Sequence, residues 1–261
     1  MKVIKVDLPS NLRELELHVL SDWHIGDKHH DAFHTERILT HIKETDNAYC
    51  VLNGDLMDAA IASSVGDSYG AELNPMEQLK LCVRIFKPLA DAGKILAILP
   101  GNHENRIWKT CGIDTTAMMA AQLGLSHRYS ETAALLFIRF GESKVDGHHK
   151  RKMVYTAYIS HGSGGGKRVG GKINRLEDMA NIVDADIYVM GHVHQPAIIR
   201  NSYYRVSAAN SSIQCVDRLF VNTASALNYG GYGEAQGFRP ASKENPVILL
   251  SGTEKKAKAK V

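Results

Sequence analysis

Short apolar runs and longer amphipathic segments alternate along the first half of the chain. The apolar runs have the length of buried strands and lie at residues 15–20, 49–52 and 95–99. Segments with apolar residues at helical spacing lie between or after them, at residues 31–45, 75–92 and 114–123. Asn74 and Pro75 suit the cap and first turn of the middle segment, and Gly93 predicts its end. The pattern therefore predicts alternating strands and helices.

The second half of the chain is richer in strand patterns. We expect one helix over residues 173–183 and strands over residues 133–140, 153–160, 187–190, 197–204, 212–221 and 247–250. The polar stretch 141–152 predicts a hairpin loop, and a Ser- and Gly-rich loop is expected over 61–74. These elements are typical of an α/β sandwich, in which mixed sheets pack together and helices cover the outside.

Length and composition predict one soluble domain. The chain has 261 residues, of which 44% are hydrophobic and 23% charged, close to the average for globular proteins. We expect a single domain over residues 1–252 and a disordered, basic Lys- and Ala-rich tail over residues 253–261. The net charge of +3 is too near balance to indicate a nucleic-acid partner by itself.

The cysteines and the N-terminal residues indicate the cellular compartment in which we expect the protein. Cys50, Cys82, Cys111 and Cys215 are widely spaced and form no CxxC pair, which favours reduced thiols over a disulfide framework. Residues 1–7 contain no apolar signal-peptide core, and no apolar run approaches the roughly 20 residues that a membrane-spanning helix needs. We therefore expect a cytoplasmic protein with no membrane partner.

Five short motifs share one arrangement, because each follows directly on a hydrophobic run and supplies residue types that bind metals. They are Asp22-x-His24, Gly54-Asp55, Gly101-Asn102-His103-Glu104, His161-Gly162 and Gly191-His192-x-His194. In open α/β sheets, ligands collect at the carboxyl ends of the strands. If the hydrophobic runs are neighbouring strands, all five motifs converge on one edge of the sheet.

The chemistry of these residue types points to transition metals. A mixture of imidazole and carboxylate favours such ions over the all-oxygen cages of calcium. We expect two divalent ions, with Mn²⁺ first and Fe, Zn or Ni as alternatives. A carboxylate can bridge two ions that lie about 3.5–4 Å apart, and such a pair can bind phosphate oxygens and activate a water.

The ordered motifs resemble those of the calcineurin-like metallophosphoesterase family over about residues 17–195. The resemblance implies a four-layer α/β/β/α sandwich of two mixed sheets, and hydrolysis of phosphate esters. It implies that His103 lies near the leaving-group oxygen, as proton donor or stabilising cation, and that Asp58 orients this histidine. The implied metal ligands are Asp22, His24 and His194 for the first ion, Asn102, His161 and His192 for the second, and Asp55 as the bridge.

Two further features bear on the substrate. Protein Ser/Thr phosphatases of the family carry Arg-Gly directly after the Asp that corresponds to Asp58, and this chain has Ala59-Ala60 there. Glu104, by contrast, matches those enzymes. The missing arginine makes a phosphoprotein substrate less favoured. The Gly-rich segment after His161 carries Lys167 and Arg168, which we expect to act in a substrate-binding lid, with a loop that has no substrate role as the alternative.

These features favour a phosphodiesterase that acts on a nucleotide or nucleic acid through in-line attack by an activated water. A phosphomonoesterase acting on a small molecule or a protein uses the same chemistry and stays open. A non-catalytic, metal-bound scaffold is the third alternative. Relatives of that kind tend to lose ligands, whereas every ligand position is filled here.

Overall fold

The computed structural model describes residues 1–62, 64, 71–145 and 149–261, which form two β-sheets and the helices around them. The five-stranded sheet has the strand order β11-β10-β2-β3-β4. Its strands are β2 (Glu14–Leu20), β3 (Ala48–Asn53), β4 (Ile95–Leu99), β10 (Val247–Ser251) and β11 (Ala257–Lys260). β2, β3 and β4 are parallel, so their carboxyl ends lie at the same edge of the sheet.

The six-stranded sheet has the strand order β1-β5-β6-β7-β9-β8. Its strands are β1 (Lys2–Asp7), β5 (Ala133–Val145), β6 (His149–Ser160), β7 (Ile187–Met190), β8 (Ala197–Ser207) and β9 (Ser212–Asn222). β6, β7 and β9 run parallel to one another, whereas β5 and β8 are antiparallel to their neighbours β6 and β9. Both sheets are therefore mixed, as expected.

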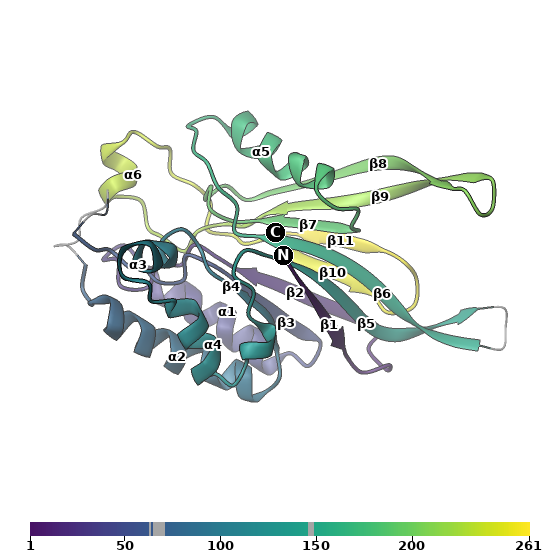
Figure 1. The fold of residues 1–261 in the computed structure, drawn as a ribbon, viewed down its shortest axis with the longest axis horizontal. Helices are drawn as coiled ribbons and strands as arrows, with labels where there is room; N and C mark the ends of the chain where they lie inside the picture. The colour runs from purple at the N-terminus through teal and green to yellow at the C-terminus, as the bar shows by residue number, and fades with distance from the viewer. Residues whose placement is uncertain (63, 65–70, 146–148) are drawn as a thin grey trace.

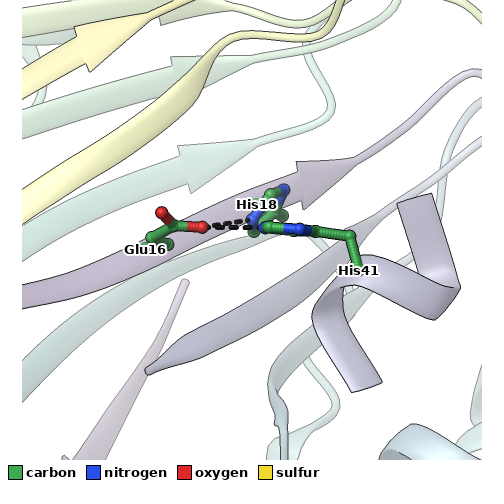
Figure 2. A group of neighbouring side chains, drawn as sticks. All are labelled: Glu16, His18 and His41. Atoms are coloured by element: carbon green, nitrogen blue, oxygen red, sulfur yellow. Dashed lines mark hydrogen bonds and ion pairs between the residues drawn. The ribbon is translucent and has the colours of Figure 1, made fainter. Parts of the chain in front are cut away.

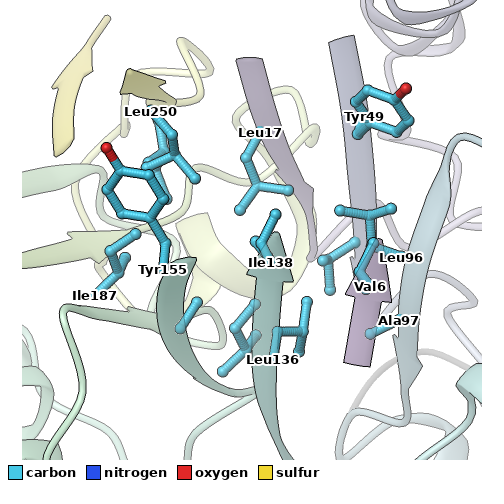
Figure 3. Close-up of a cluster of buried hydrophobic side chains, with 14 of the residues drawn as sticks. Val6, Leu17, Tyr49, Leu96, Ala97, Leu136, Ile138, Tyr155, Ile187 and Leu250 are labelled. Atoms are coloured by element: carbon cyan, nitrogen blue, oxygen red, sulfur yellow. The ribbon is translucent and has the colours of Figure 1, made fainter. Parts of the chain in front are cut away.

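The main hydrophobic core lies between the two sheets. Alternate residues of β2, such as Leu17 and Val19, point into it and join side chains of the other sheet. Figure 3 shows Leu17 and Leu250 beside Ile138 and Tyr155 in this central layer. Because side chains alternate along a strand, one face of each sheet fills this layer and the other face is left for helices.

Helices cover the outer faces of the sheets and complete four layers (Figure 1). α5 (Val169–Asp178) lies on the six-stranded sheet, and a short α6 (Gly231–Ala235) follows β9. The helices on the five-stranded side are α1 (Ala32–Glu44), α2 (Pro75–Asp91), α3 (Glu104–Cys111) and α4 (Thr115–Gln122). The α/β/β/α sandwich is confirmed. Within the described part of the chain, no helix is both long and apolar enough to cross a membrane.

The end of the chain differs from the expected disordered tail. Ala257–Lys260 form β11, which pairs antiparallel with β10. Ala257 and Ala259 pack against the central core, while Lys258 and Lys260, which alternate with them, are exposed. The Tyr155 hydroxyl lies 2.7, 2.8 and 3.0 Å from the carbonyl oxygens of residues 251, 254 and 256, so its single proton can be donated to any one of them and the group holds the preceding turn. The Lys/Ala alternation is therefore the two-residue period of an edge strand, and the expectation is wrong for these four residues.

Other departures concern short elements. The sequence reading missed β1 and α3, and it placed the start of α5 four residues late because Gly170 and Gly171 have low helix propensity. The polar stretch expected as a hairpin loop instead continues β5 to Val145 and starts β6 at His149, with residues 146–148 outside the described part. Most of the loop expected over 61–74 also lies outside the described residues.

Candidate metal centre

The five motifs converge in one place, but they come from two sheets. Asp22, Asp55 and Asn102 follow β2, β3 and β4 of the five-stranded sheet, whereas His161 and His192 follow β6 and β7 of the six-stranded sheet. The expectation of a single sheet edge is thus wrong in this respect. The carboxyl ends of parallel strands from both sheets meet because the sheets share one core.

Five of the seven candidate ligands have a left-handed backbone. The φ angle is 58° at Asp22, 47° at His24, 49° at Asp55, 68° at His192 and 51° at His194. This region costs an L-residue about 1–2 kcal/mol, and such strain gathers at functional sites. The conformation turns the chain sharply at the end of each strand.

Two glycines permit close packing around the carboxylates. A Cβ atom built at Gly101 would lie 2.1 Å from Asp55 Oδ1, and one at Gly191 would lie 2.2 Å from the Ser21 hydroxyl and 2.8 Å from Asp22 Oδ2. Both distances are far below van der Waals contact. Any other residue at these positions would displace a candidate metal ligand.

The first group of donor atoms comes from Asp22, His24 and His194. The Nε2 atoms of the two histidines are 3.2 Å apart, and His194 Nε2 lies 3.3 Å from Asp22 Oδ1. Asp22 and His24 are buried, and His194 is partly exposed. Atoms that bind one ion at about 2.1 Å lie about 3.0–3.4 Å from each other. The observed separations therefore fit ligands of a single ion.

The second group comes from Asp55, Asn102, His161 and His192. His161 Nε2 lies 3.2 Å from Asp55 Oδ2 and 3.3 Å from Asn102 Oδ1. His192 Nδ1 lies 2.6 Å from the same Asn102 oxygen. The structure therefore brings together the three residues that the resemblance assigned to the second ion and the expected bridging residue, Asp55.

The hydrogen bonds of two histidines fit metal binding. His161 Nδ1 lies 2.8 Å from the carbonyl oxygen of Asn53, and His192 Nε2 lies 2.6 Å from that of Gly164. A carbonyl oxygen can only accept, so each of these nitrogens carries a proton. Metal-binding histidines commonly hold their second nitrogen in this way. The opposite nitrogen of His192, Nδ1, therefore carries a lone pair and faces Asn102 Oδ1 at 2.6 Å, and a cation would resolve this approach of two acceptors.

The buried carboxylates and histidines shift one another's pKa. Burial opposes ionisation of Asp22, but His194 and His161 outweigh it and lower the pKa of Asp22 to about 2. Burial likewise opposes ionisation of Asp55, yet His161 above all holds the pKa of Asp55 well below its usual range. Both carboxylates are therefore charged at neutral pH, which is the form that binds a metal.

Three imidazoles of the two donor groups divide into two kinds. Burial lowers the pKa of His24 and His192, which keeps both rings neutral and able to donate a lone pair. Burial also acts on His161, but the charge of Asp55 outweighs it and raises the pKa of His161 to about 10. An ion binding at His161 would therefore displace a proton from this ring.

His103 lies beside the first group, with its ring edge-on to His24 and the two ring centroids 4.3 Å apart. Its Nδ1 lies 2.6 Å from the carbonyl oxygen of Asp58 and 3.4 Å from the Asp58 carboxylate. Asp58 therefore contacts His103 mainly through its backbone, which the sequence reading did not foresee. Burial opposes protonation of His103, but the hydrogen bonding of its ring to the Asp58 carboxylate and carbonyl and the charge of Asp55 raise its pKa.

Arg106 is a site residue that the sequence reading missed. Its guanidinium Nη2 donates to His103 Nε2 at 2.8 Å, and the side chain is partly buried. Arg106 follows His103 by three residues at the start of α3, a spacing that puts two side chains on the same side of a helix. If α3 had been predicted from the sequence, the helical spacing would have placed Arg106 next to His103, the candidate proton donor.

Glu104 connects two of the motif loops. Its buried carboxylate accepts from the backbone N–H groups of Asp55, Leu56, Met57 and Gly101, at 2.8–3.0 Å. Burial, and then the charge of Asp55, raises the pKa of Glu104. Glu104, the residue that this chain shares with the protein phosphatases, thus accepts hydrogen bonds from backbone N–H groups here. These hydrogen bonds hold the loop that carries Asp55 in position.

Two surface hollows adjoin the ligand cluster. One, of about 410 Å³, reaches Asn102 and His161. The other, of about 390 Å³, contains none of the seven candidate ligands but includes Gln195, the residue after His194. Four cationic side chains line this second hollow, two of which were singled out from the sequence: Lys167, Arg168, Lys172 and Arg239. Lys167 and Arg168 are exposed and lie directly before the first residue of α5.

Two solved structures show a weak similarity to this chain. A conserved protein of Streptococcus pneumoniae, described as a predicted phosphoesterase, is 14% identical over 95% of this chain and 98% of its own, with a TM-score of 0.35. Zinc-bound Vps29 of Entamoeba histolytica is 11% identical over 94% of this chain and 97% of its own, with a TM-score of 0.38. These low scores add nothing to the argument, and no curated protein matches significantly.

A family model does match most of the chain. The model for calcineurin-like phosphoesterases covers residues 17–196, which include all five motifs and every candidate ligand. The extent of this match, together with the convergence of the motifs on one site, leads to the family assignment. The chain belongs to the calcineurin-like phosphoesterase family.

Proposed function

We propose that this protein hydrolyses phosphate esters with two divalent metal ions, Mn²⁺ foremost. The observation that supports this most is the pair of donor groups, each with atoms 2.6–3.3 Å apart, that meet around the charged carboxylates of Asp22 and Asp55. The first group would hold one ion and the second group the other, with Asp55 between them. When bound, such ions neutralise charge on the phosphate and lower the pKa of the attacking water.

The residues beside the ligands supply acid catalysis and charge. His103 has a raised pKa, so its imidazolium form can give a proton to the leaving-group oxygen. In the described state its Nε2 accepts from Arg106, which means that Nε2 carries no proton there. A substrate phosphate would attract the guanidinium of Arg106 and leave Nε2 free to carry the proton.

We propose a phosphodiester, in a nucleotide or nucleic acid, as the substrate. A monoester phosphate needs only one anion site, which the metal centre would supply. The cationic hollow beside His194 is a second site of positive charge. It supports this choice, because it suits a substrate with a further phosphate. Phe238 also lines this hollow, with Lys172 Nζ 5.9 Å from its ring centroid, so an aromatic ring and a cation lie together there.

A phosphomonoester is the second candidate, and Arg106 favours it. The absence of an arginine at Ala59-Ala60 argued against phosphoprotein substrates, because no cation seemed available to clamp the phosphate. Arg106 supplies a cation beside His103 from another part of the chain. The Ala59-Ala60 argument is therefore weaker than the sequence alone suggested.

The test is hydrolysis of bis-p-nitrophenyl phosphate against p-nitrophenyl phosphate, with Mn²⁺ added. A higher kcat/KM on the diester supports the proposal, and the reverse order favours the monoesterase. Single- and double-stranded DNA and RNA, run beside a panel of cyclic nucleotides, then identify the diester. An Asp55→Asn, His103→Ala double variant is the inactive control. A wild type that never exceeds this control would favour a metal-bound scaffold and overturn the proposal.

A further inference from the structure

A second cluster of metal-ligand side chains lies away from the motifs. Glu16 and His18 are two residues apart on β2, so their side chains project from the same face of the strand. His41 comes from the facing helix α1. Figure 2 shows the three side chains pointing toward one another, with the Glu16 carboxylate joined to both imidazoles.

The distances in this cluster are those of a coordination site. Glu16 Oε2 lies 2.9 Å from His41 Nε2 and 3.5 Å from His18 Nε2, and the three donor atoms all lie within 4.8 Å of one another. His41 Nδ1 lies 3.5 Å from the Thr45 hydroxyl, which can fix the ring while Nε2 faces the carboxylate.

The buried nitrogen of His18 points independently to a missing ligand. His18 is 5% exposed, and its Nε2 has no hydrogen-bond partner among the described residues. The approach to Glu16 at 3.5 Å is an ion-pair distance without hydrogen-bond geometry. Burial favours the neutral imidazole, whose two tautomers place either a proton or a lone pair on Nε2, and an ion would be bound by the tautomer with the lone pair. An unsatisfied buried polar atom of this kind costs about 1–3 kcal/mol unless something binds it.

Two imidazoles and one carboxylate form a donor set that zinc uses in proteins, with a fourth position left for water. Lys258 and Lys260 of β11 share this face, two strands from β2 and about 9–10 Å away between backbones, and burial, His41 and the charge of Lys260 together lower the pKa of His18 and so keep its ring neutral. We propose that Glu16, His18 and His41 bind a zinc ion or a similar transition ion at a site separate from the dinuclear centre. His18 precedes Asp22 by four residues, about 13 Å along the strand, so no ligand is shared.

An ion at this site would join α1 to β2. β2 ends in the motif that carries Asp22 and His24, and α1 follows the loop after that motif. The ion would therefore anchor both ends of the segment that contains the first ligand group. Its role is structural, so hydrolysis supported by Mn²⁺ does not depend on it.

The experiment counts zinc ions per chain after equilibrium dialysis of the full-length protein and metal analysis. His41→Ala and Glu16→Gln should each bind one zinc equivalent fewer than the wild type. His127→Ala is the matched control, because His127 is an exposed histidine outside the cluster, and it should bind as many as the wild type. Equal zinc content in wild type, His41→Ala and Glu16→Gln would overturn the proposal.

Folding and geometry are checked separately. The side chain of His41 is 50% exposed, so its removal should leave Mn²⁺-supported hydrolysis and the circular dichroism spectrum unchanged. In Co²⁺-loaded protein, His41→Ala should lose part of the visible absorption that tetrahedral Co²⁺ gives, and His127→Ala should retain it. A cobalt spectrum that is the same in wild type and His41→Ala would contradict the site even if zinc counts differed.

Discussion

Single residues at the strand ends combine strain, burial and charge. Asp22 and Asp55 are buried, ionised and held in the left-handed backbone region, each an unfavourable state when taken alone. The surrounding histidines offset the charge, and the glycines next to them make the space. Several residues with unfavourable free energies at one place are expected where the binding of a metal offsets those free energies.

Arg106 is the residue whose role is most open to test. If it contacts the substrate phosphate, Arg106→Ala should lower kcat/KM on the preferred ester by about 10- to 100-fold, because one charge-stabilising donor is lost. Steady-state kinetics with saturating Mn²⁺ measure this. Arg37→Ala, an exposed arginine on α1, should have no effect. Equal losses in the two variants would show that the change acts through overall charge.

Glu104 should matter for stability. Gln at this position keeps the shape but puts an NH₂ group against backbone N–H donors that the carboxylate now satisfies. Glu104→Gln should lower the free energy of unfolding by about 2–4 kcal/mol. Urea denaturation measures it, with the exposed Glu36→Gln as a control that should stay within about 0.5 kcal/mol of the wild type. A Glu104→Gln variant as stable as this control would show that the four hydrogen bonds contribute little.

At the scale of elements, the loops between strand and helix carry the chemistry. The loop from β6 to α5 is the clearest case, because the carbonyl of Gly164 contacts His192 while Lys167 and Arg168 line the cationic hollow. One loop thus touches a candidate ligand and the proposed second phosphate site. If the cationic hollow binds substrate as proposed, this loop would connect metal binding with substrate binding.

The Lys167→Ala, Arg168→Ala double variant should raise KM on the true substrate by about 10-fold and leave kcat unchanged, because two cations outside the ligand cluster act on binding alone. Initial-rate kinetics at low ionic strength measure the change. Lys80→Ala, Arg84→Ala on α2 removes the same charge from exposed positions and should leave KM unaltered. A KM that stays the same in the first variant would remove this loop from substrate binding.

Elements with a strong local pattern could be predicted from the sequence, and elements without one could not. The capped helix from Pro75 to Asp91 and the apolar strand Ile95–Leu99 carry enough periodic residues for their type to be read locally. α3 has only eight residues and no side-chain cap, and β11 alternates Ala with Lys, which resembles a solvated tail. Their structure depends on packing against other parts of the chain.

For the whole molecule, metal binding should be linked to folding. Chelation should remove the phosphoesterase activity and lower Tm, and Mn²⁺ should restore both. An ion that binds only the folded state stabilises it by about 2.7 kcal/mol at 100 times its Kd. Differential scanning calorimetry with and without Mn²⁺ measures the shift. An Asp55→Asn variant, which lacks the bridging charge, should show a smaller shift, and a Tm indifferent to chelation in wild type would contradict a metal centre.

The sequence by itself determined which residues could bind metal and where in the chain they would lie. Ligand residue types follow hydrophobic runs directly, and both the runs and the ligands are local features. Only the tertiary structure decided that the motifs meet from two sheets, that Arg106 and the Asp58 carbonyl contact His103, and that His41 joins Glu16 and His18. These contacts depend on strand order and on the packing of helices against sheets. Such long-range arrangements arise from burial of the whole chain, which no local pattern contains.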